Sequence, residues 1–365
     1  MKSITVTTQR AINYGAVLQA YALHKIQLGF NIENSLLDYP KVKSIYEKTQ
    51  IKLCRRTMIS LALNSAAFFN KSKLNNLHNK FSHFVESNIK LTKVYNSITE
   101  ANAAPPVADF YIDGSDQVFG LRGVYDSLRT LNFGDASIPR FSYAASLGEY
   151  DWNEKEKKSF RKILSSFKMV SVRENYAKDY IESFTDQKCL VHMDPVFILD
   201  ISEWNNLAIC PPIDEPYILV FPLLGNKNTQ ELVDKLKGML KCKIVCIQTH
   251  AFKRINADVT IIDAGPQEFL GWVKYAQAVV TTSFHGTAFS ILYKKPFYTL
   301  IKNYKSQRIT DLLNMLALSD RIYTGSKTKI DLDINFEHAA QIIAKERLSC
   351  ATYFQHIKEI CGGKK

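Results

Sequence analysis

The residues best suited to chemistry lie within Thr281–Ser290, which reads TTSFHGTAFS. The run before it is apolar and β-branched, as in strands buried on both faces, and the residues after His285 are typical of the first turns of a helix. At such a strand-to-helix turn, unpaired backbone N–H groups and the positive end of the helix dipole favour a bound anion such as phosphate. Ser283, Gly286 and Thr287 add small polar groups and a close backbone approach. His285 could alternatively only cap the helix, but ligands bind at the carboxyl ends of strands in open α/β sheets, so we expect a site here.

Three further strand-like runs end on polar groups in the first half of the chain. Ser115 and Asp116 follow one of them, Arg173 and Glu174 follow the second, and the third ends on Asp194. An arginine offers a planar fork for a carboxylate or a phosphate, and a carboxylate can accept a hydrogen bond from a sugar hydroxyl. The alternatives are an ordinary turn with an Asx hydrogen bond at Ser115 and Asp116, and a structural ion pair of Arg173 with Glu174 or another acid.

Alternating strand-like and helix-like segments position these residues. Residues 4–7 predict a first strand, and residues 15–28 predict a helix with apolar side chains at helical spacing, which Gly29 ends. The loop between them lacks GxGxxG, so a dinucleotide pyrophosphate is not indicated. Asn13 and Gln19 could instead contact a polar acceptor, although Asn13 could equally cap the helix.

The second half repeats this series of strands and helices from residue 217 onwards, after Pro211 and Pro212. We therefore predict an α/β protein with two Rossmann-like domains facing a cleft, residues 1–208 and residues 209–365, the latter ending in C-terminal helices. The pattern of residues 41–100 is helical, basic and poor in glycine, which favours a helical insertion in the first domain.

The chain carries a formal net charge of +12, from 47 basic and 35 acidic residues among 365. This excess allows nucleic acid, anionic lipid headgroups or phosphorylated substrates as partners. The sequence lacks a helix-turn-helix signal, an RNP-like motif and a zinc module, which disfavours nucleic acid, and no His/Cys cluster predicts a metal site. The basic stretch 48–56 could lie on an anionic membrane surface or be a solvated helical face. With no apolar run of membrane-spanning length and no secretory leader, we expect a cytoplasmic protein that can associate peripherally with the inner membrane face.

Seven motifs spread over nearly the whole chain resemble those of the polysaccharide pyruvyl transferase family. They are INYGAVLQAYAL, DFYIDGSDQVF, RFSYAASLG, VSVRE, MDPVF, TTSFHGTAFSILYKKPF and KSQRITDLLNMLAL, in the expected order and spacing. The resemblance implies a two-domain fold similar to that of the GT-B glycosyltransferases. It also implies transfer of a pyruvyl group from phosphoenolpyruvate to sugar hydroxyls of a surface-polysaccharide precursor, with phosphoenolpyruvate as co-substrate and no further cofactor.

His285 matches the histidine of the family's S-F-H-G-T element and Arg173 matches the arginine of its S-V-R-E element. The resemblance implies that both residues belong to the phosphoenolpyruvate site. Relatives with an S-x-R-x-H element carry an arginine where this chain has Ser283. Other cations must then hold the donor, and the candidates are Arg308, Lys302 and Lys305.

The implied reaction forms a cyclic ketal by protonating the methylene carbon of the enol, adding two sugar hydroxyls and losing phosphate. His285 is the expected acid, since histidine titrates near neutral pH. Arg173 is expected to hold either the carboxylate or the phosphate of the donor. The backbone amides of residues 286–288 are expected to hold the other of these two groups. Asp116 or Glu174 is the expected base, and the expected acceptor contacts are Asn13, Gln19, Ser115 and Glu174.

The positive charge suits a lipid-linked oligosaccharide as acceptor, because electrostatics can hold an enzyme near a substrate at the inner membrane face. Two other functions remain open. One is a GT-B glycosyltransferase, which a nucleotide sugar and not phosphoenolpyruvate would protect from thermal unfolding. The other is a non-catalytic basic protein that binds glycan or nucleic acid, which steeply salt-dependent binding to arbitrary DNA without turnover would favour.

Overall fold

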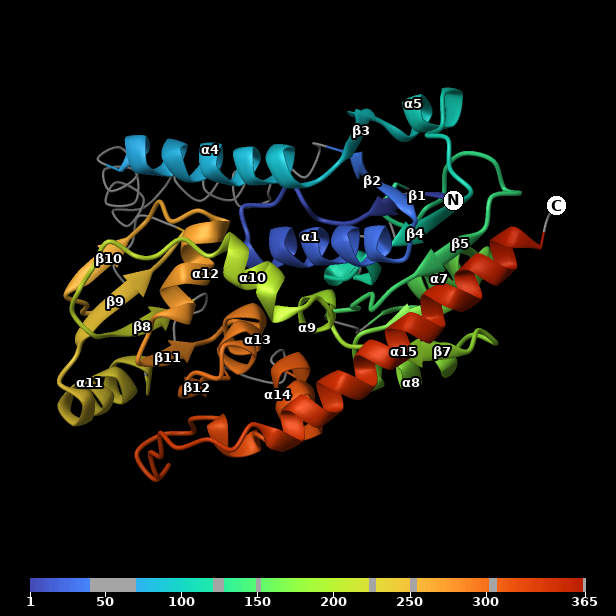
Figure 1. Cartoon of the computed structure of the whole chain (residues 1–365). Coiled ribbons are helices and arrows are strands. Elements are labelled where there is room, and N and C mark those ends of the chain that lie inside the picture. The colour runs from blue at the N-terminus through green and yellow to red at the C-terminus, as the bar shows by residue number, and fades with distance from the viewer. Residues whose placement is uncertain are drawn as a thin grey trace.

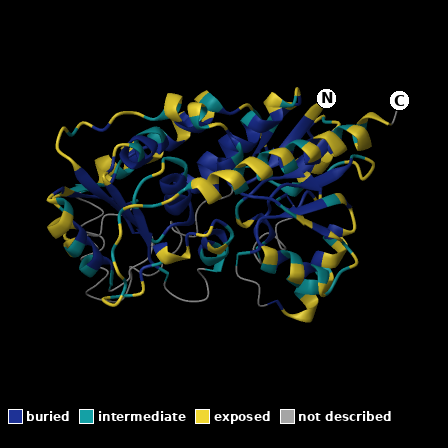
Figure 2. Cartoon of the chain, turned by 60° about the horizontal axis from the view of Figure 1, so that its bottom comes forward, coloured by how far each residue is buried: buried dark blue, intermediate teal, exposed yellow. Residues whose placement is uncertain are grey.

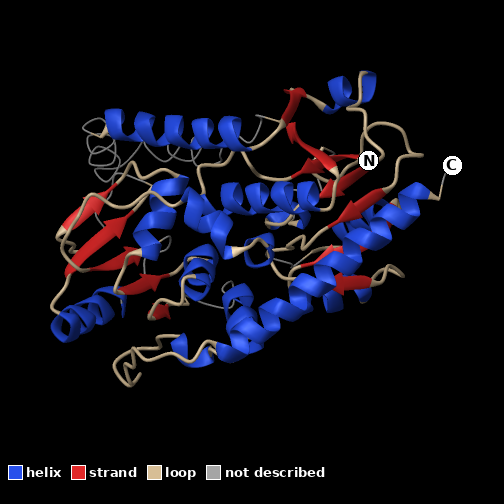
Figure 3. Cartoon of the chain, viewed as in Figure 1, coloured by secondary structure: helices blue, strands red, loops and turns tan. Residues whose placement is uncertain are grey.

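The computed structural model describes residues 1–39, 70–120, 128–148, 152–222, 228–249, 255–301 and 307–363. These residues form two α/β domains, each built around one parallel β-sheet, with helices packed between the two sheets (Figure 1). Figure 3 shows the strands in two separate groups, with helices around and between them. The prediction of two Rossmann-like domains is confirmed.

The first sheet has seven parallel strands in the order β3-β2-β1-β4-β5-β6-β7. The strand order reverses between β1 and β4, which makes the loops after these two strands the switch point where ligands bind in such sheets. Every residue of β4 is buried, as expected for a strand covered on both faces. The strands are β1 (Lys2–Val6), β2 (Glu33–Asp38), β3 (Leu91–Val94), β4 (Phe110–Asp113), β5 (Arg140–Ser142), β6 (Phe167–Val172) and β7 (Cys189–Val191).

Helix α1 (Tyr14–Gly29) follows β1 and is buried along most of its length. It begins where the Asn13 side chain accepts hydrogen bonds from the N–H groups of Gly15 and Ala16, so the capping alternative for Asn13 is confirmed. The other helices of this half are α4 (Lys71–Asn88), α5 (Ile98–Ala103), the short 3₁₀ turn η1 (Gln117–Phe119), α7 (Glu154–Leu164), α8 (Asn175–Glu182), α9 (Pro195–Ile198) and α10 (Ile201–Leu207).

The predicted helical insertion at residues 41–100 is only partly helical. Residues 40–69 lie outside the described residues, so the basic stretch 48–56 is not described. Helix α4 is followed by β3, which pairs with β2 at the edge of the first sheet. A strand was not expected here, because β3 is short, with two half-buried and two exposed residues, and therefore lacks an apolar signature.

The second sheet has five parallel strands in the order β10-β9-β8-β11-β12, with its switch point between β8 and β11. Its strands are β8 (Tyr217–Phe221), β9 (Lys243–Ile247), β10 (Val259–Ile261), β11 (Ala278–Thr281) and β12 (Phe297–Thr299). The helices of this half are α11 (Asn228–Leu240), α12 (Pro266–Lys274), α13 (Phe284–Leu292), α14 (Gln307–Met315), the 3₁₀ turn η3 (Ser319–Arg321) and α15 (Glu337–Gly362).

The last helix, α15, returns to the first domain, which corrects the expectation that residues 209–365 belong together. Cys350 and Phe354 share an apolar cluster with Phe110 and Phe141 of the first sheet. The Tyr353 hydroxyl donates a hydrogen bond of 2.6 Å to the Ser142 carbonyl. Figure 1 shows α15 running diagonally across the first domain, with β5 above it and β7 below it in this view. The chain therefore crosses between the domains twice, once before β8 and once before α15.

The two domains meet through an apolar contact around α1, α4, α12 and α13. The ring of Tyr14 stacks on Phe269 with centroids 4.4 Å apart, and its hydroxyl donates to the Ala264 carbonyl at 2.7 Å. Lys80 of α4 pairs with Glu268 of α12 at 2.6 Å. Figure 2 shows buried residues concentrated in the strands and exposed ones on the outer helix faces. Within the described part of the chain, no helix has the length and apolar character needed to cross a membrane.

Candidate functional site

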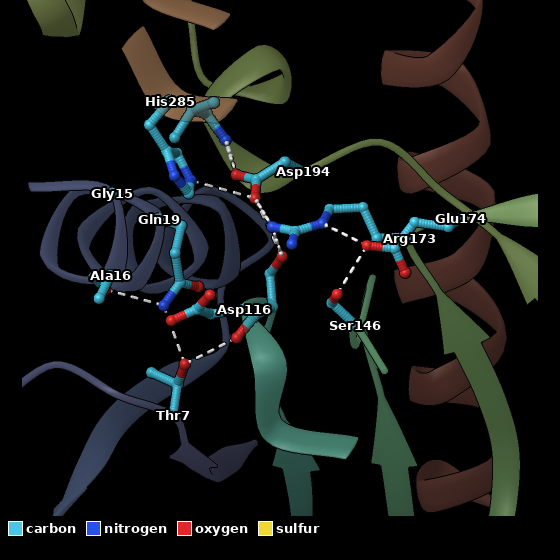
Figure 4. A network of polar contacts seen from close by, with 12 residues as sticks. Thr7, Gly15, Ala16, Gln19, Asp116, Ser146, Arg173, Glu174, Asp194 and His285 are labelled. Atoms are coloured by element: carbon cyan, nitrogen blue, oxygen red, sulfur yellow. Dashed lines mark hydrogen bonds and ion pairs between the residues drawn. The ribbon is translucent and has the colours of Figure 1, made fainter. Parts of the chain in front are cut away.

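Residues that follow strands of both sheets meet in a buried polar cluster (Figure 4). His285 comes from the second domain, Arg173 and Asp116 come from the first, and Asp194 lies at the start of the segment that joins the domains. The structure thus brings together the three residues predicted to be catalytic, and it adds Asp194 at their centre.

His285 lies in the first turn of α13, after β11, as the sequence predicted. Only 7% of the residue is exposed. Its Nε2 atom lies 3.3 Å from Oδ2 of Asp194 but has no well-formed hydrogen bond. Burial beside a carboxylate gives the imidazole a defined orientation, with Nε2 directed at Asp194.

Asp194 is the hub of the cluster. Its Oδ2 accepts hydrogen bonds from Arg173 Nη1 at 2.6 Å and from the Ser115 hydroxyl at 3.1 Å, while its Oδ1 caps α9 through the Val196 N–H. Burial acts to raise the pKa of Asp194, but His285, Arg173 and the Val196 N–H outweigh it and hold this pKa well below its usual value. The carboxylate is therefore ionised and shared by a cation of the first domain and the histidine of the second.

Arg173 follows β6 and is buried, as a structural ion pair requires. Its Nε donates to Glu174 at 3.1 Å, and its Cζ lies 4.5 Å from the centre of the Phe284 ring. Burial acts to lower the pKa of Arg173, but Glu174, Asp194 and Asp116 together raise it above its usual value. The ion-pair alternative is thus confirmed. It leaves Nη2 buried without a hydrogen-bond partner among the described residues, so one edge of the guanidinium remains able to bind a ligand.

Asp116 has an uncommon backbone conformation, with φ 73° and ψ −175°. This region is almost restricted to glycine, and such strained residues cluster at functional sites. The Thr8 hydroxyl donates to Asp116 Oδ2 at 2.7 Å. Burial favours a raised pKa, but Arg173, the Thr8 hydrogen bond, His285 and Arg308 together lower the pKa of Asp116. Asp116 is therefore an ionised carboxylate within electrostatic reach of the cluster's cations.

Several buried atoms in this small region lack a hydrogen-bond partner among the described residues. Buried polar groups are normally satisfied, so a concentration of exceptions points to a missing ligand or water. The atoms are Arg173 Nη2, Glu174 Oε2, His285 Nε2 and Gln19 Oε1. Arg173 Nη2 is a donor, whereas Glu174 Oε2 and Gln19 Oε1 are acceptors, so a group that satisfied them all would both accept and donate hydrogen bonds.

Gln19 and Ser115, two of the predicted acceptor contacts, are buried inside the cluster. Gln19 is fully buried, and its Nε2 donates to Thr7 Oγ1 at 2.9 Å and to the Ala16 carbonyl at 2.8 Å. Ser115 is also fully buried and donates to Asp194. Glu174 accepts hydrogen bonds from the Ser146 hydroxyl and from Arg173. All three support the cluster, and only Gln19 and Glu174 keep an unpaired oxygen.

Arg308 adds a second arginine to this region from α14 in the other domain. Burial and the nearby charge of Arg173 lower the pKa of Arg308, against the opposing effects of Glu174, Asp116 and Tyr176. No described residue makes a hydrogen bond or ion pair with its guanidinium. The candidates Lys302 and Lys305 lie outside the described residues.

The backbone amides expected to bind the anion are already engaged, which corrects that part of the prediction. The Gly286 N–H donates to the Ser283 hydroxyl at 3.2 Å, and the Thr287 N–H donates to the Ser283 carbonyl at 3.0 Å. The Thr287 hydroxyl also donates to the Ser283 carbonyl. Ser283, Gly286 and Thr287 thus cap and begin α13, because the helix satisfies its own first N–H groups. Gly286 is required for packing, since a Cβ there would lie 2.3 Å from Thr281 Oγ1.

Sequence reasoning missed the role of Asp194, although it noted a strand-like run that ends on this residue. The repeated pattern of a strand followed by a carboxylate was the available signal. It also missed Thr8 and Ser146, whose hydroxyls orient Asp116 and Glu174. Within the described ranges, no group of three or more His, Cys, Asp or Glu residues is arranged to hold a metal ion.

Comparison with solved structures shows the fold. The protein assigned as a UDP-N-acetylglucosamine 2-epimerase from Listeria monocytogenes has a TM-score of 0.51 at 10% identity, with coverage of 100% of this chain and 97% of that one. The UDP-GlcNAc 2-epimerase of Neisseria meningitidis has a TM-score of 0.46 at 12% identity, covering 96% and 100%. The spinosyn rhamnosyltransferase SpnG has a TM-score of 0.48 at 10% identity, covering 98% and 100%. The predicted GT-B-like fold is confirmed.

No curated protein matches the chain. The family model described as polysaccharide pyruvyl transferase matches residues 13–303, which is well over half of the sequence. The matched span includes every member of the polar cluster except Arg308 and the β1 loop residues Thr7 and Thr8. The chain belongs to the polysaccharide pyruvyl transferase family.

Proposed function

We propose that this protein transfers a pyruvyl group from phosphoenolpyruvate to two hydroxyls of a sugar in a surface-polysaccharide precursor, forming a cyclic ketal and releasing phosphate. The observation that carries the proposal is the buried Arg173–Asp194–His285 cluster between the two domains. It combines an ionised carboxylate, a cation with an unpaired edge and a histidine, next to unsatisfied buried atoms.

The donor carries a carboxylate and a phosphate and therefore needs two separate cationic contacts. Arg173 offers its unpaired Nη2, and Arg308 offers a guanidinium without a partner among the described residues. Arginine suits both groups because its planar fork can donate two parallel hydrogen bonds. Arg173 is held by Asp194 and Glu174, so it binds without first losing side-chain freedom.

The chemistry needs one proton on carbon and the loss of one phosphate. His285 donates a proton to the methylene carbon, which becomes the methyl group, while a sugar hydroxyl adds to the neighbouring carbon. The C–O bond to phosphate then breaks, and a second hydroxyl adds to the same carbon to close the ketal. One of the two hydroxyl protons replaces the proton that His285 gave to the methyl group, and the other leaves with phosphate. The proposed donor atom is Nε2, which lies 3.3 Å from the Asp194 carboxylate and has no hydrogen-bond partner among the described residues.

Asp116 is the proposed base for the sugar hydroxyl. Its lowered pKa keeps it ionised at neutral pH, and the Thr8 hydrogen bond holds one of its oxygens. A carboxylate with a low pKa is a weak base, so its main contribution is to orient the hydroxyl and accept the proton late in the reaction. Gln19 and Glu174 each keep an unpaired buried oxygen nearby that can accept a hydroxyl.

The acceptor is proposed to be a lipid-linked oligosaccharide at the cytoplasmic membrane face. The net charge of +12 supports this, because basic residues near an anionic membrane each contribute about 1 kcal/mol of attraction. Flotation with anionic and neutral vesicles at low and high salt tests it. Binding to anionic vesicles that high salt releases is expected, and binding that ignores lipid charge would contradict the proposal.

The central test is phosphate release from phosphoenolpyruvate, with and without a panel of lipid-linked and synthetic glycosides. Wild type should release phosphate only with a suitable acceptor, and His285→Ala should release none even with that acceptor. The exposed His83 of α4 supplies a matched control, because His83→Ala removes an imidazole far from the cluster in sequence and fold. No release with any acceptor, together with thermal protection by a nucleotide sugar, would replace this proposal with a glycosyltransferase.

A further inference from the structure

Gly15, in the first turn of α1, lies against the imidazole of His285. A Cβ atom built on Gly15 would lie 1.9 Å from His285 Nδ1, 2.3 Å from Cγ and 2.5 Å from Cε1. Each distance is far below any real Cβ contact, so no side chain fits there while the imidazole keeps its place. Figure 4 shows Gly15 beside His285, across the boundary between the domains.

The backbone of Gly15 does not itself require glycine. The residue is helical and is absent from the described residues with positive φ. Alanine is the better helix former at such a position. Its N–H already donates to the Asn13 cap, so the helix end is formed without help from its side chain. The contact with His285 is therefore the physical reason for glycine at this position.

The imidazole is held from two directions. Gly15 contacts the edge of the ring that carries Nδ1, and Asp194 lies 3.3 Å from Nε2 on the other side. The neighbouring Tyr14 fixes α1 to the second domain through its stack on Phe269 and its hydrogen bond to Ala264. Gly15 of α1 and Asp194 thus flank the imidazole, and α1 is itself packed against the second domain.

We infer that Gly15 is a positioning residue for His285. Its missing side chain leaves room for the imidazole that α13 of the second domain places next to Asp194. This inference rests on the role of His285 in the proposed function. The contact itself is a property of the fold, so the two can be tested separately.

Gly15→Ala tests the catalytic consequence, and Gly29→Ala is its matched control. Gly29 ends the same helix, and a Cβ there would meet nothing within 4 Å. A displacement of the imidazole by about 1 Å costs roughly 10²-fold in rate. We therefore expect Gly15→Ala to lower kcat for acceptor-dependent phosphate release by about 10²-fold while the KM for phosphoenolpyruvate changes little, because Arg173 and Arg308 are untouched. Gly29→Ala should match wild type.

Thermal unfolding of a double-mutant cycle tests the contact without any activity. Gly15→Ala should lower Tm in the wild-type background. In the His285→Ala background the ring is gone, so adding Gly15→Ala should leave Tm unchanged or raise it slightly. An equal loss of Tm in both backgrounds would show that the clash is not with His285 and would overturn the inference.

The outcomes separate this inference from the proposed function. If His285→Ala abolishes turnover while Gly15→Ala keeps wild-type kcat, the positioning role alone is overturned. If wild type releases no phosphate with any acceptor, the proposed function falls, while the unfolding cycle can still show the contact of Gly15 with His285. If His285→Ala keeps full turnover, the catalytic role of His285 falls, and the positioning role of Gly15 falls with it. Loss of kcat in Gly15→Ala together with coupling to His285 in the unfolding cycle supports both.

Discussion

Replacing Asp194 with asparagine should nearly abolish turnover while keeping the shape of the site. The substitution removes the charge that His285 and Arg173 share and keeps the side-chain volume. Asp194 lies 2.6 Å from Nη1 of Arg173 and 3.3 Å from Nε2 of His285, so the neutral amide removes the negative charge that faces both groups. Removing one partner of a buried charge pair costs about 3–5 kcal/mol, and if most of this cost is expressed in the transition state, kcat should fall by about 10³-fold.

The assay is acceptor-dependent phosphate release at saturating phosphoenolpyruvate, and Glu174→Gln is the matched control. Glu174 holds Arg173 on its other side, so this variant also removes one carboxylate from the arginine. It leaves the contact between Asp194 and His285 intact. The expected loss of kcat in Glu174→Gln is therefore at least tenfold smaller than in Asp194→Asn. Circular dichroism should show that both variants remain folded.

Two results would refute the reasoning about Asp194. One is an Asp194→Asn variant that keeps more than about a tenth of the wild-type kcat, since the electrostatic argument requires a loss of several powers of ten. The other is an equal loss in Glu174→Gln, which would show that Asp194 acts by holding Arg173 and not by supporting His285.

Three further predictions follow from individual residues. Arg308→Ala should raise the KM for phosphoenolpyruvate by about 10- to 100-fold, because a charge-assisted hydrogen bond contributes about 1.5–3 kcal/mol, and an unchanged KM would remove Arg308 from the donor site. Burial raises the pKa of Asp113 well above its usual 3.8, and neither of its oxygens has a partner among the described residues. Because the pKa of Asp113 is higher in the folded than in the unfolded protein, ionising this carboxyl lowers the stability of the fold. The loss is absent below about pH 4 and grows as the pH rises. Asp113→Asn should therefore match wild type in urea unfolding at pH 4 and be more stable at pH 8, and a difference that does not change with pH would contradict this. Tyr14→Phe leaves the buried Ala264 carbonyl unpaired and should cost about 1–2 kcal/mol of unfolding free energy, whereas an unchanged Tm would mean that this hydrogen bond between the domains does not stabilise the fold.

Local sequence patterns predicted most elements near the site. Residues 15–28 with Gly29 as the stop correspond to α1, and the apolar run before His285 corresponds to β11. These features depend on capping, helical periodicity and β-branched composition, which act over a few residues. The short strand β3 escaped notice because its residues are half-buried or exposed, and the sequence shows no apolar pattern there.

The sequence by itself determined the parallel α/β architecture, and it placed His285, Arg173 and Asp116 directly after the ends of strands. Only the tertiary structure decided which of these residues meet. Asp194 gains its role because Arg173 and His285 approach it from two domains, and Gly15 gains its role from a histidine 270 positions later in the chain. The return of α15 to the first sheet is likewise a long-range contact. The physical reason is that a strand or helix forms from neighbouring residues, whereas a shared charge or an excluded side chain exists only between surfaces that folding brings together.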